Sequence, residues 1–451
     1  MTGTTGTASA RRRREVVDAL RRGTVPANGL DLLAVGVERF APALDAELDT
    51  VAAGGSAFKA VRGEYGAGKT FLTRWLAERA LRRGFAAAEV QISESETPLH
   101  RLETVYRRVA ESLRTAAFPP SALRPVLDAW LYTLEADAAA LDPTLADAAG
   151  TARLDEAVTG LLEKRLAAVS ARTPVFAQAL RAYRAAVMAQ DNATADGIAA
   201  WLGGQPHVAA AVKRAAGVRG DLDHFGAMAF LQGLLTVLRD SGHPGLLLVL
   251  DEVETLQRVR GDVRDKALNA LRQLVDEVDA GRFPGLYLVI TGTPAFYDGP
   301  SGVPRLAPLA QRLATDLSTD PRFDNPRAVQ LRLPGFDHDA LVTLGLKVRD
   351  LYAEAAQEPG RVRERVDDAY VAELATAVAG GLGGKAGVAP RVFLKKLVGD
   401  VLDRVDQFPD FDPRRHYRLT LRRDELSDVE RNAAGLAVPP AASPDDVDLD
   451  L

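Results

Sequence analysis

Apolar runs and amphipathic segments alternate along the chain and predict a sheet covered by helices. Five short apolar segments have the length and continuity of buried strands. They span residues 57–61, 87–92, 246–250, 286–290 and 328–333. In the segments between them, apolar residues recur every three or four positions, which is typical of helices with one buried face. Because strands alternate with helices, we predict an α/β fold with a parallel sheet.

Two long regions, residues 97–240 and the part of the chain from residue 337, carry only helical periodicity. Residues 97–240 are rich in Ala, Leu, Arg and Glu and are too long for an ordinary connection between strands, so we interpret them as a helical insertion. Helices predicted within it cover residues 99–116, 121–138, 154–170, 173–190 and 225–239. Helices predicted elsewhere cover residues 11–22, 40–53, 71–83, 264–280, 339–358, 367–379 and 390–407.

These segments predict a domain organisation in six parts. They are a disordered leader (1–10), the first part of the α/β domain (11–96), the helical insertion (97–240), the rest of the α/β core (241–336), a C-terminal helical domain (337–425) and a disordered tail (426–451). The tail is assigned by the four aspartates between 445 and 450, which stand among prolines and serine, a composition that cannot build a core.

Composition narrows the classes of function. The 451 residues are 47% hydrophobic, which is enough for a substantial core. Lysine and arginine number 56 against 61 acidic residues, a net charge of −5. This balance argues against a protein that coats nucleic acid with its whole surface, but it leaves room for a local basic groove. The chain has no cysteine, which excludes disulfides, thiolate metal sites and cysteine nucleophiles.

Targeting and metal signals are weak. The six histidines include no pair at metal-ligand spacing. The first ten residues are polar and lead into an amphipathic helix, unlike a secretory signal. The longest apolar run, residues 246–250, is far too short to cross a membrane. We therefore expect a cytoplasmic protein without membrane association.

The strongest chemical signal lies directly after the first predicted strand. Residues 63–70 fit G-x-x-x-x-G-K-[ST], the phosphate-binding P-loop, at every fixed position. Glycines let the backbone curl so that its N–H groups can face a phosphate, and the following helix adds its positive dipole end. Lys69 would reach the β- and γ-phosphates, and the Thr70 hydroxyl would bind Mg²⁺. Expected nucleotide contacts are Gly63, Glu64, Tyr65, Gly66, Ala67, Gly68, Lys69, Thr70 and Phe71.

A second signal closes the third predicted strand. Residues 246–250 are apolar and are followed by Asp251 and Glu252, the pattern called Walker B. Asp251 would hold the magnesium ion, and Glu252 would polarise the attacking water. The glutamate favours hydrolysis over binding alone. Together, the two motifs predict an ATPase of the P-loop NTPase fold that uses ATP and Mg²⁺.

Three weaker signals concern residues that could complete the site. Thr291, or else Thr293, ends the fourth predicted strand and is a candidate for contact with the γ-phosphate or the lytic water; the alternative is a threonine that caps a turn. Arg391 opens a C-terminal helix and could close over the phosphates. Arg312, in preference to Arg305, is a candidate arginine finger for a neighbouring subunit of a homo-oligomer. Each of these arginines could equally be a solvated surface charge.

This combination of motifs resembles the AAA+ ATPases, especially their origin-recognition-like branch. The resemblance implies that residues 337–425 form a helical lid carrying Arg391. It also implies that Val35 and Gly36, in the segment Val-Gly-Val-Glu-Arg, lie near the adenine. Val37 stands where that branch usually has arginine, so the specific adenine contact is a departure from the pattern.

A closer resemblance is to the ATP-binding proteins of bacteriophage-exclusion (BREX) systems. It rests on FKAVRGEYGAGKTFLTRWLAERALRRGF (58–85), LLLVLDEVETLQ (246–257), ITGTPAFYD (290–298) and APRVFLKKLVGDVLD (389–403), and covers roughly residues 11–425. The resemblance implies anti-phage defence beside a DNA methyltransferase, a phosphatase-like protein and a helicase, with association to DNA.

Three functions are compatible with these motifs. The leading hypothesis is an ATP-driven conformational machine that acts on double-stranded DNA or on partner proteins. The alternative is a nucleotide-gated switch or scaffold, like the STAND relatives of AAA+ proteins, with little turnover; Glu252 argues mildly against it. A small-molecule kinase is disfavoured by the C-terminal helical domain, and GTP specificity by the lack of an Asn-Lys-x-Asp motif.

Overall fold

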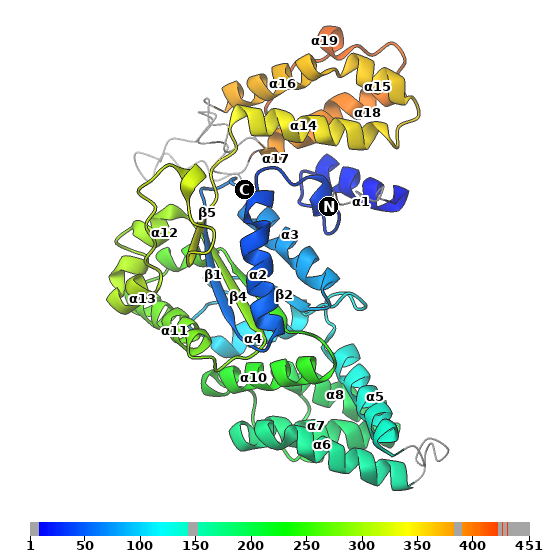
Figure 1. The fold of residues 1–451 in the computed structure, drawn as a ribbon, viewed down its shortest axis with the longest axis vertical. Coiled ribbons are helices and arrows are strands. Elements are labelled where there is room, and N and C mark those ends of the chain that lie inside the picture. Colours follow the sequence, from blue (N-terminus) through cyan, green and yellow to red (C-terminus); the bar gives the residue numbers. More distant parts are fainter. Residues whose placement is uncertain (1–8, 143–151, 383–389, 423–425, 427–430, 432–451) are drawn as a thin grey trace, which may run out of the picture. The chain divides into compact units, whose positions relative to one another are not determined.

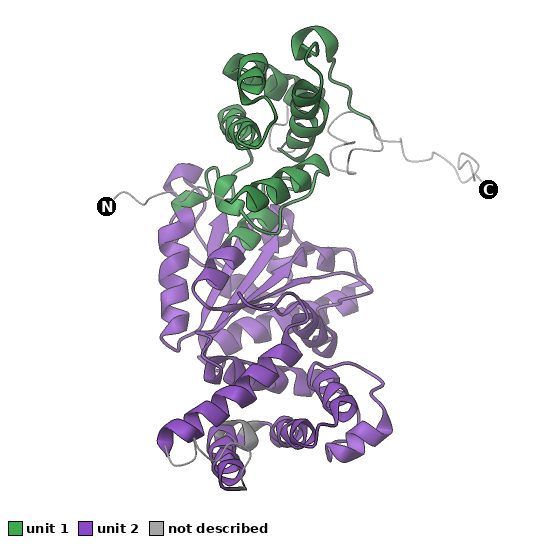
Figure 2. Ribbon diagram, turned by 90° about the vertical axis from the view of Figure 1, so that its right-hand side faces the viewer, with its two compact units in different colours: residues 1–39, 63–75, 333–451 green, residues 40–62, 76–332 purple. Residues whose placement is uncertain are grey.

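The computed structural model describes residues 9–142, 152–382, 390–422, 426 and 431. The chain divides into two compact units, coloured separately in Figure 2. Unit 1 consists of Met1–Arg39, Gly63–Trp75 and Leu333–Leu451, and unit 2 of Phe40–Arg62 and Leu76–Arg332. Helix α3 (Lys69–Arg82) begins in unit 1 and continues into unit 2.

Unit 2 is built on a parallel five-stranded sheet, as the sequence predicts (Figure 1). Its strands are β1 (Ala57–Arg62), β2 (Ala86–Gln91), β3 (Leu246–Asp251), β4 (Leu286–Gly292) and β5 (Gln330–Arg332). The spatial order is β2-β3-β4-β1-β5, so β4 lies between β1 and β3. This mixed α/β architecture is consistent with a P-loop NTPase-like fold.

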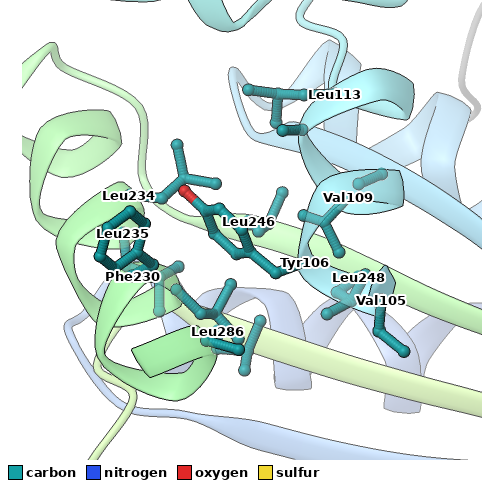
Figure 3. Close-up of a cluster of buried hydrophobic side chains, with 14 of the residues drawn as sticks. Val105, Tyr106, Val109, Leu113, Phe230, Leu234, Leu235, Leu246, Leu248 and Leu286 are labelled. Carbon is teal, nitrogen blue, oxygen red and sulfur yellow. The ribbon is translucent and has the colours of Figure 1, made fainter. Parts of the chain in front are cut away.

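One face of the sheet is covered by three helices. They are α4 (Leu102–Ser112), α10 (His224–Asp240) and α11 (Gly261–Asp279). Alternate residues of β3, namely Leu246, Leu248 and Leu250, share a single core with them because successive side chains of a strand point to opposite faces. Figure 3 shows part of this core around the buried ring of Tyr106, whose hydroxyl donates to the Leu202 carbonyl at 2.9 Å.

Helix α2 (Ala41–Ala52) packs against β1 and β4. The Lys59 side chain of β1 is almost fully buried, with an exposed fraction of 1%. Its ammonium group lies 2.6 Å from Glu47 of α2 and donates to the Ala328 carbonyl at 2.7 Å. The Tyr287 hydroxyl donates to the same glutamate. A buried charge in this position is stable only because each of its partners is present.

The described part of the region from 97 to 240 is helical, and it contains two more helices than predicted. Its remaining members are α5 (Leu123–Leu141), α6 (Ala152–Arg172), α7 (Pro174–Met188), α8 (Asn192–Leu202) and α9 (Ala210–Ala215). The predicted helix 99–116 ends early, at Ser112, because Arg114 exchanges two backbone hydrogen bonds with Ala87 of β2. Helix α8, which the sequence analysis missed, begins after Asp191. The Asp191 carboxylate caps the helix by accepting a hydrogen bond from the Thr194 N–H.

Unit 1 has a helical core of its own. Its described helices are α1 (Ala10–Arg21), α14 (His338–Ala353), α15 (Pro359–Arg365), α16 (Asp368–Gly381), α17 (Pro390–Lys395), α18 (Asp403–Gln407) and α19 (Pro413–His416), and a π-helical turn, Lys396–Leu402, joins α17 to α18. The predicted helix 339–358 was too long: it ends at Ala353, and Pro359 starts α15, in agreement with the preference of proline for a first turn.

The two predicted disordered ends fall mostly outside the described residues. Residues 1–8 and all of 427–451 except Arg431 lie outside them. At the inner edge of the leader, Ala10 already belongs to α1, because the Ser9 hydroxyl accepts from the Arg12 N–H and caps the helix. Two short helices that the sequence analysis missed, α12 (Pro294–Asp298) and α13 (Ala307–Arg312), follow β4 in unit 2.

Candidate functional site

The loop 63–68 leaves the carboxyl end of β1 and leads into α3. Gly66 and Gly68 have φ angles of 82° and 90°, which side chains with a Cβ rarely adopt. At Gly63, a Cβ would approach those of Ala67 and Leu333 to 3.2 Å. The glycines of the P-loop motif are therefore required by the backbone of the loop itself.

The Lys69 side chain is held against its own loop. It is 8% exposed, and its ammonium group donates to the carbonyls of Gly63 at 2.9 Å and Glu64 at 3.3 Å. The same ammonium lies 5.1 Å from the centroid of the Tyr65 ring. A phosphate that takes this lysine as partner has to replace carbonyl oxygens, which are weaker acceptors than an anion. Thr70, the next residue, lies in the first turn of α3.

The other candidate residues of unit 1 lie beside its helical core. Val35 and Phe71 are partly buried against that core, together with Phe336. Gly36 has a φ of 77° and open space around the position of a Cβ. Arg391 is an exposed residue at the start of α17.

In unit 2, three residues at the carboxyl ends of β3 and β4 are hydrogen-bonded to one another. The exposed fraction is 5% for Asp251 and 0% for Thr291. The Thr291 hydroxyl donates to Asp251 Oδ1, and the Glu252 N–H lies 3.1 Å from both Asp251 Oδ1 and Thr291 Oγ1. The structure thus brings together three of the predicted residues. Thr291 fixes the orientation of the Asp251 carboxylate, and the predicted contact of Thr291 with phosphate or water stays a prediction.

The Glu252 side chain has a partner that the sequence analysis missed. Glu252 adopts a left-handed conformation, with φ 59° and ψ 42°, immediately after β3. Its carboxylate accepts a hydrogen bond of 2.9 Å from the amide of Gln91. Gln91 is the last residue of β2 and is paired in register with Asp251. A polar residue at the end of a predicted strand was the only signal for it.

Residues 8–421 match a protein family described as BREX system ATP-binding protein BrxC/D. The chain belongs to this family. It is therefore an ATP-binding protein of the BREX system, which confirms the prediction of the family and of ATP as ligand. Curated proteins give no match to the chain.

The residues present fit the nucleotide that the family binds. Gly66 and Gly68 give the loop the curvature that a phosphate requires, and Lys69 supplies a cation there. The described residues contain no group of three or more His, Cys, Asp or Glu side chains able to hold a metal ion.

The remaining candidates lie further along unit 2. Thr293, the second choice to Thr291, is buried at the start of α12. Arg305 donates to Asp265 at 3.1 Å, and Arg312 donates to Asp276 of α11 at 2.9 Å. Both guanidinium groups are partly exposed and engaged in ion pairs on the surface of unit 2.

A second residue missed from the sequence is Arg62, the last residue of β1. Its guanidinium makes two hydrogen bonds to the Asp298 carboxylate of α12, one of them 3.2 Å long, and a third of 3.3 Å to Gln330 of β5. It also lies 5.6 Å from the centroid of the Tyr297 ring. Arg62 therefore connects the end of β1 to the segment that follows β4 through hydrogen bonds.

Among the described residues, no helix combines the length and apolar content that a membrane crossing requires.

Proposed function

We propose that this BREX ATP-binding protein hydrolyses ATP with Mg²⁺ and uses the cycle to change conformation. The supporting observation is the group formed by Asp251, Thr291 and the Glu252 N–H at the ends of β3 and β4. Because β1 runs parallel to β4, with Arg62 paired to Gly292, its end lies at the same edge of the sheet, and the loop 63–68 starts one residue later. In doubly wound sheets, ligands bind at the carboxyl edge of the strands.

Each residue in this proposal has one role. Bound MgATP supplies the electrophilic phosphorus. Lys69 would neutralise the β- and γ-phosphate oxygens, and Thr70 and Asp251 would hold the magnesium ion. Glu252 accepts a proton from the attacking water. Thr291 positions Asp251, as its hydrogen bond indicates.

Finer features of the proposal come from the AAA+ resemblance. Residues 337–425 would act as a lid that brings Arg391 to the phosphates, and Val35 and Gly36 would lie beside the adenine. Arg312 would serve a neighbouring subunit, for which it must leave Asp276. DNA or another protein of the defence system would be the target.

The test is ATP turnover by the purified protein, with and without double-stranded DNA. Glu252→Gln should bind ATP and lower kcat by roughly 10²-fold or more, because the amide cannot accept the proton. Glu94→Gln, an exposed glutamate in the loop after β2, is the matched control and should leave kcat unchanged. Unchanged turnover in Glu252→Gln would reject the general-base role.

A second candidate, the nucleotide-gated switch, is favoured by one observation. The Gln91 amide engages the Glu252 carboxylate, which is the group that hydrolysis needs. Tight ATP binding with negligible turnover, both with and without DNA, would select the switch.

A further inference from the structure

A groove of about 590 Å³ lies on the surface of unit 2, away from the ends of β3 and β4. It is formed by the loop before α4, the start of α10 and one face of α11. Five of its lining side chains are basic or imidazole groups: His100, Arg101, His224, Lys266 and Arg272. Arg101 and Lys266 are exposed.

Two carboxylates lie among the lining residues, against the three cations Arg101, Lys266 and Arg272. Asp265 accepts from Arg305, whereas one buried oxygen of Glu103 has no hydrogen-bond partner among the described residues and lies 4.0 Å from the His224 ring. The groove therefore presents more positive than negative charge, although the chain as a whole has a net charge of −5. Burial lowers the pKa of the His100 imidazole, and the charges of Arg101 and Lys266 lower it further, while the charge of Glu103 acts in the opposite direction.

The groove extends along α11, and the residue that follows its lining residue His224 is an exposed aromatic. A second hollow of about 470 Å³ shares Asp265 and Asn269 with it and extends to Arg305. The lining positions on α11 run from Asp265 to Gln273, a rise of about 12 Å along a helix. At the start of α10, the Phe225 side chain is 86% exposed and lies 5.5 Å from the His224 ring.

We propose that this groove binds a single strand of nucleic acid. Arg101 and Lys266 would contact phosphates, and Phe225 would stack on a base. A basic groove combined with an exposed aromatic ring is how proteins bind single strands, because base stacking requires an unpaired base. The span of about 12 Å along α11 limits the bound segment to a few nucleotides. The assignment rests on the proposed action on DNA, and it assigns to this surface the binding of unpaired segments of that DNA.

The groove is connected to the catalytic candidates through one loop. Residues 92–101 join the end of β2, which carries Gln91, to the lining residues His100 and Arg101. The Thr255 hydroxyl, in the turn after Glu252, lies 3.3 Å from the Ile92 carbonyl at the start of the same loop. One loop thus supplies two lining residues of the groove and the backbone carbonyl that the Thr255 hydroxyl contacts.

The test is fluorescence anisotropy of a labelled single-stranded oligonucleotide titrated with the full chain, at several salt concentrations. Lys266→Glu should weaken binding about 10-fold and reduce the slope of log K against log salt by about 0.7, the loss of one phosphate contact. Phe225→Ala should weaken it about 10-fold through lost stacking. Lys164→Glu, the same charge change on an exposed position of α6, should change affinity less than about 2-fold.

The results of these measurements separate this proposal from the proposed ATPase. Unchanged affinity in both Lys266→Glu and Phe225→Ala would overturn the groove, and so would a duplex of the same sequence that binds as tightly through the same residues. Loss of binding in both variants, with the turnover measured without nucleic acid intact, would support it. Glu252→Gln, which removes only the proposed base, should keep its affinity for the oligonucleotide. Its turnover reports on the ATPase independently.

Discussion

Replacing Gln91 by alanine should raise the rate of ATP hydrolysis. The Gln91 amide donates to the Glu252 carboxylate at 2.9 Å. This hydrogen bond directs one oxygen of the Glu252 carboxylate towards the end of β2. If Glu252 has to accept a proton from water, the hydrogen bond to Gln91 must break or rotate first. Alanine removes the amide and keeps the backbone pairing of position 91 with Asp251.

The magnitude follows from the type and exposure of this hydrogen bond. A hydrogen bond to a charged group contributes about 1.5–3 kcal/mol when it is shielded from water. Gln91 is exposed and Glu252 partly exposed, so water competes for both partners. We therefore expect about 1 kcal/mol, which corresponds to a roughly 5-fold increase in kcat. The KM for ATP should change little because Gln91 is not among the proposed nucleotide contacts.

The assay is steady-state release of phosphate by Gln91→Ala, measured without DNA. Gln257→Ala is the matched control, since its amide donates at 2.9 Å to the Ala295 carbonyl and not to Glu252. The double variant Gln91→Ala/Glu252→Gln should be as slow as Glu252→Gln alone. A kcat that falls in Gln91→Ala would refute the reasoning, because it would mean that the amide holds Glu252 in its active position.

Other predictions concern binding, stability and pH. Lys69→Ala should weaken ATP binding roughly 100-fold, because a charged hydrogen-bond donor to the phosphates is lost; normal affinity in a fluorescent-nucleotide titration would reject the P-loop assignment. Glu47→Ala should lower the free energy of unfolding, measured by urea titration, by about 3 kcal/mol, because Lys59 would stay buried without its ion pair. The control Asp49→Ala removes an exposed partner of Arg83 on the same helix and should lower the free energy of unfolding by less than about 1 kcal/mol. Burial raises the pKa of Tyr287 well above its usual value, so stability should fall as pH rises above about 10, where the unfolded tyrosine ionises first; a flat alkaline stability profile would contradict this.

The sheet strands and the phosphate loop could be predicted because each is determined by a short, continuous segment of sequence. A continuous apolar run such as Leu246–Asp251, buried along its whole length, has few alternatives to a central strand. The loop was predictable because its backbone requires glycine: Gly66 and Gly68 have positive φ angles, and a Cβ at Gly63 would meet its neighbours at 3.2 Å. Helix ends were less predictable. Arg114 lies in a helical pattern, yet its backbone pairs with β2 instead.

The contacts that control Glu252 could not be predicted, because they depend on the order of strands in space. Gln91 and Glu252 are 161 residues apart, and only the neighbouring positions of β2 and β3 bring them together. By the same reasoning, Thr291 reaches Asp251 only because β4 is inserted between β1 and β3. Strand identity follows from local hydrophobicity, whereas strand order is set by how the connecting helices pack on the two faces. A motif search therefore finds the carboxylates that could act on the nucleotide, while the amide and hydroxyl groups that orient them become visible only in the assembled sheet.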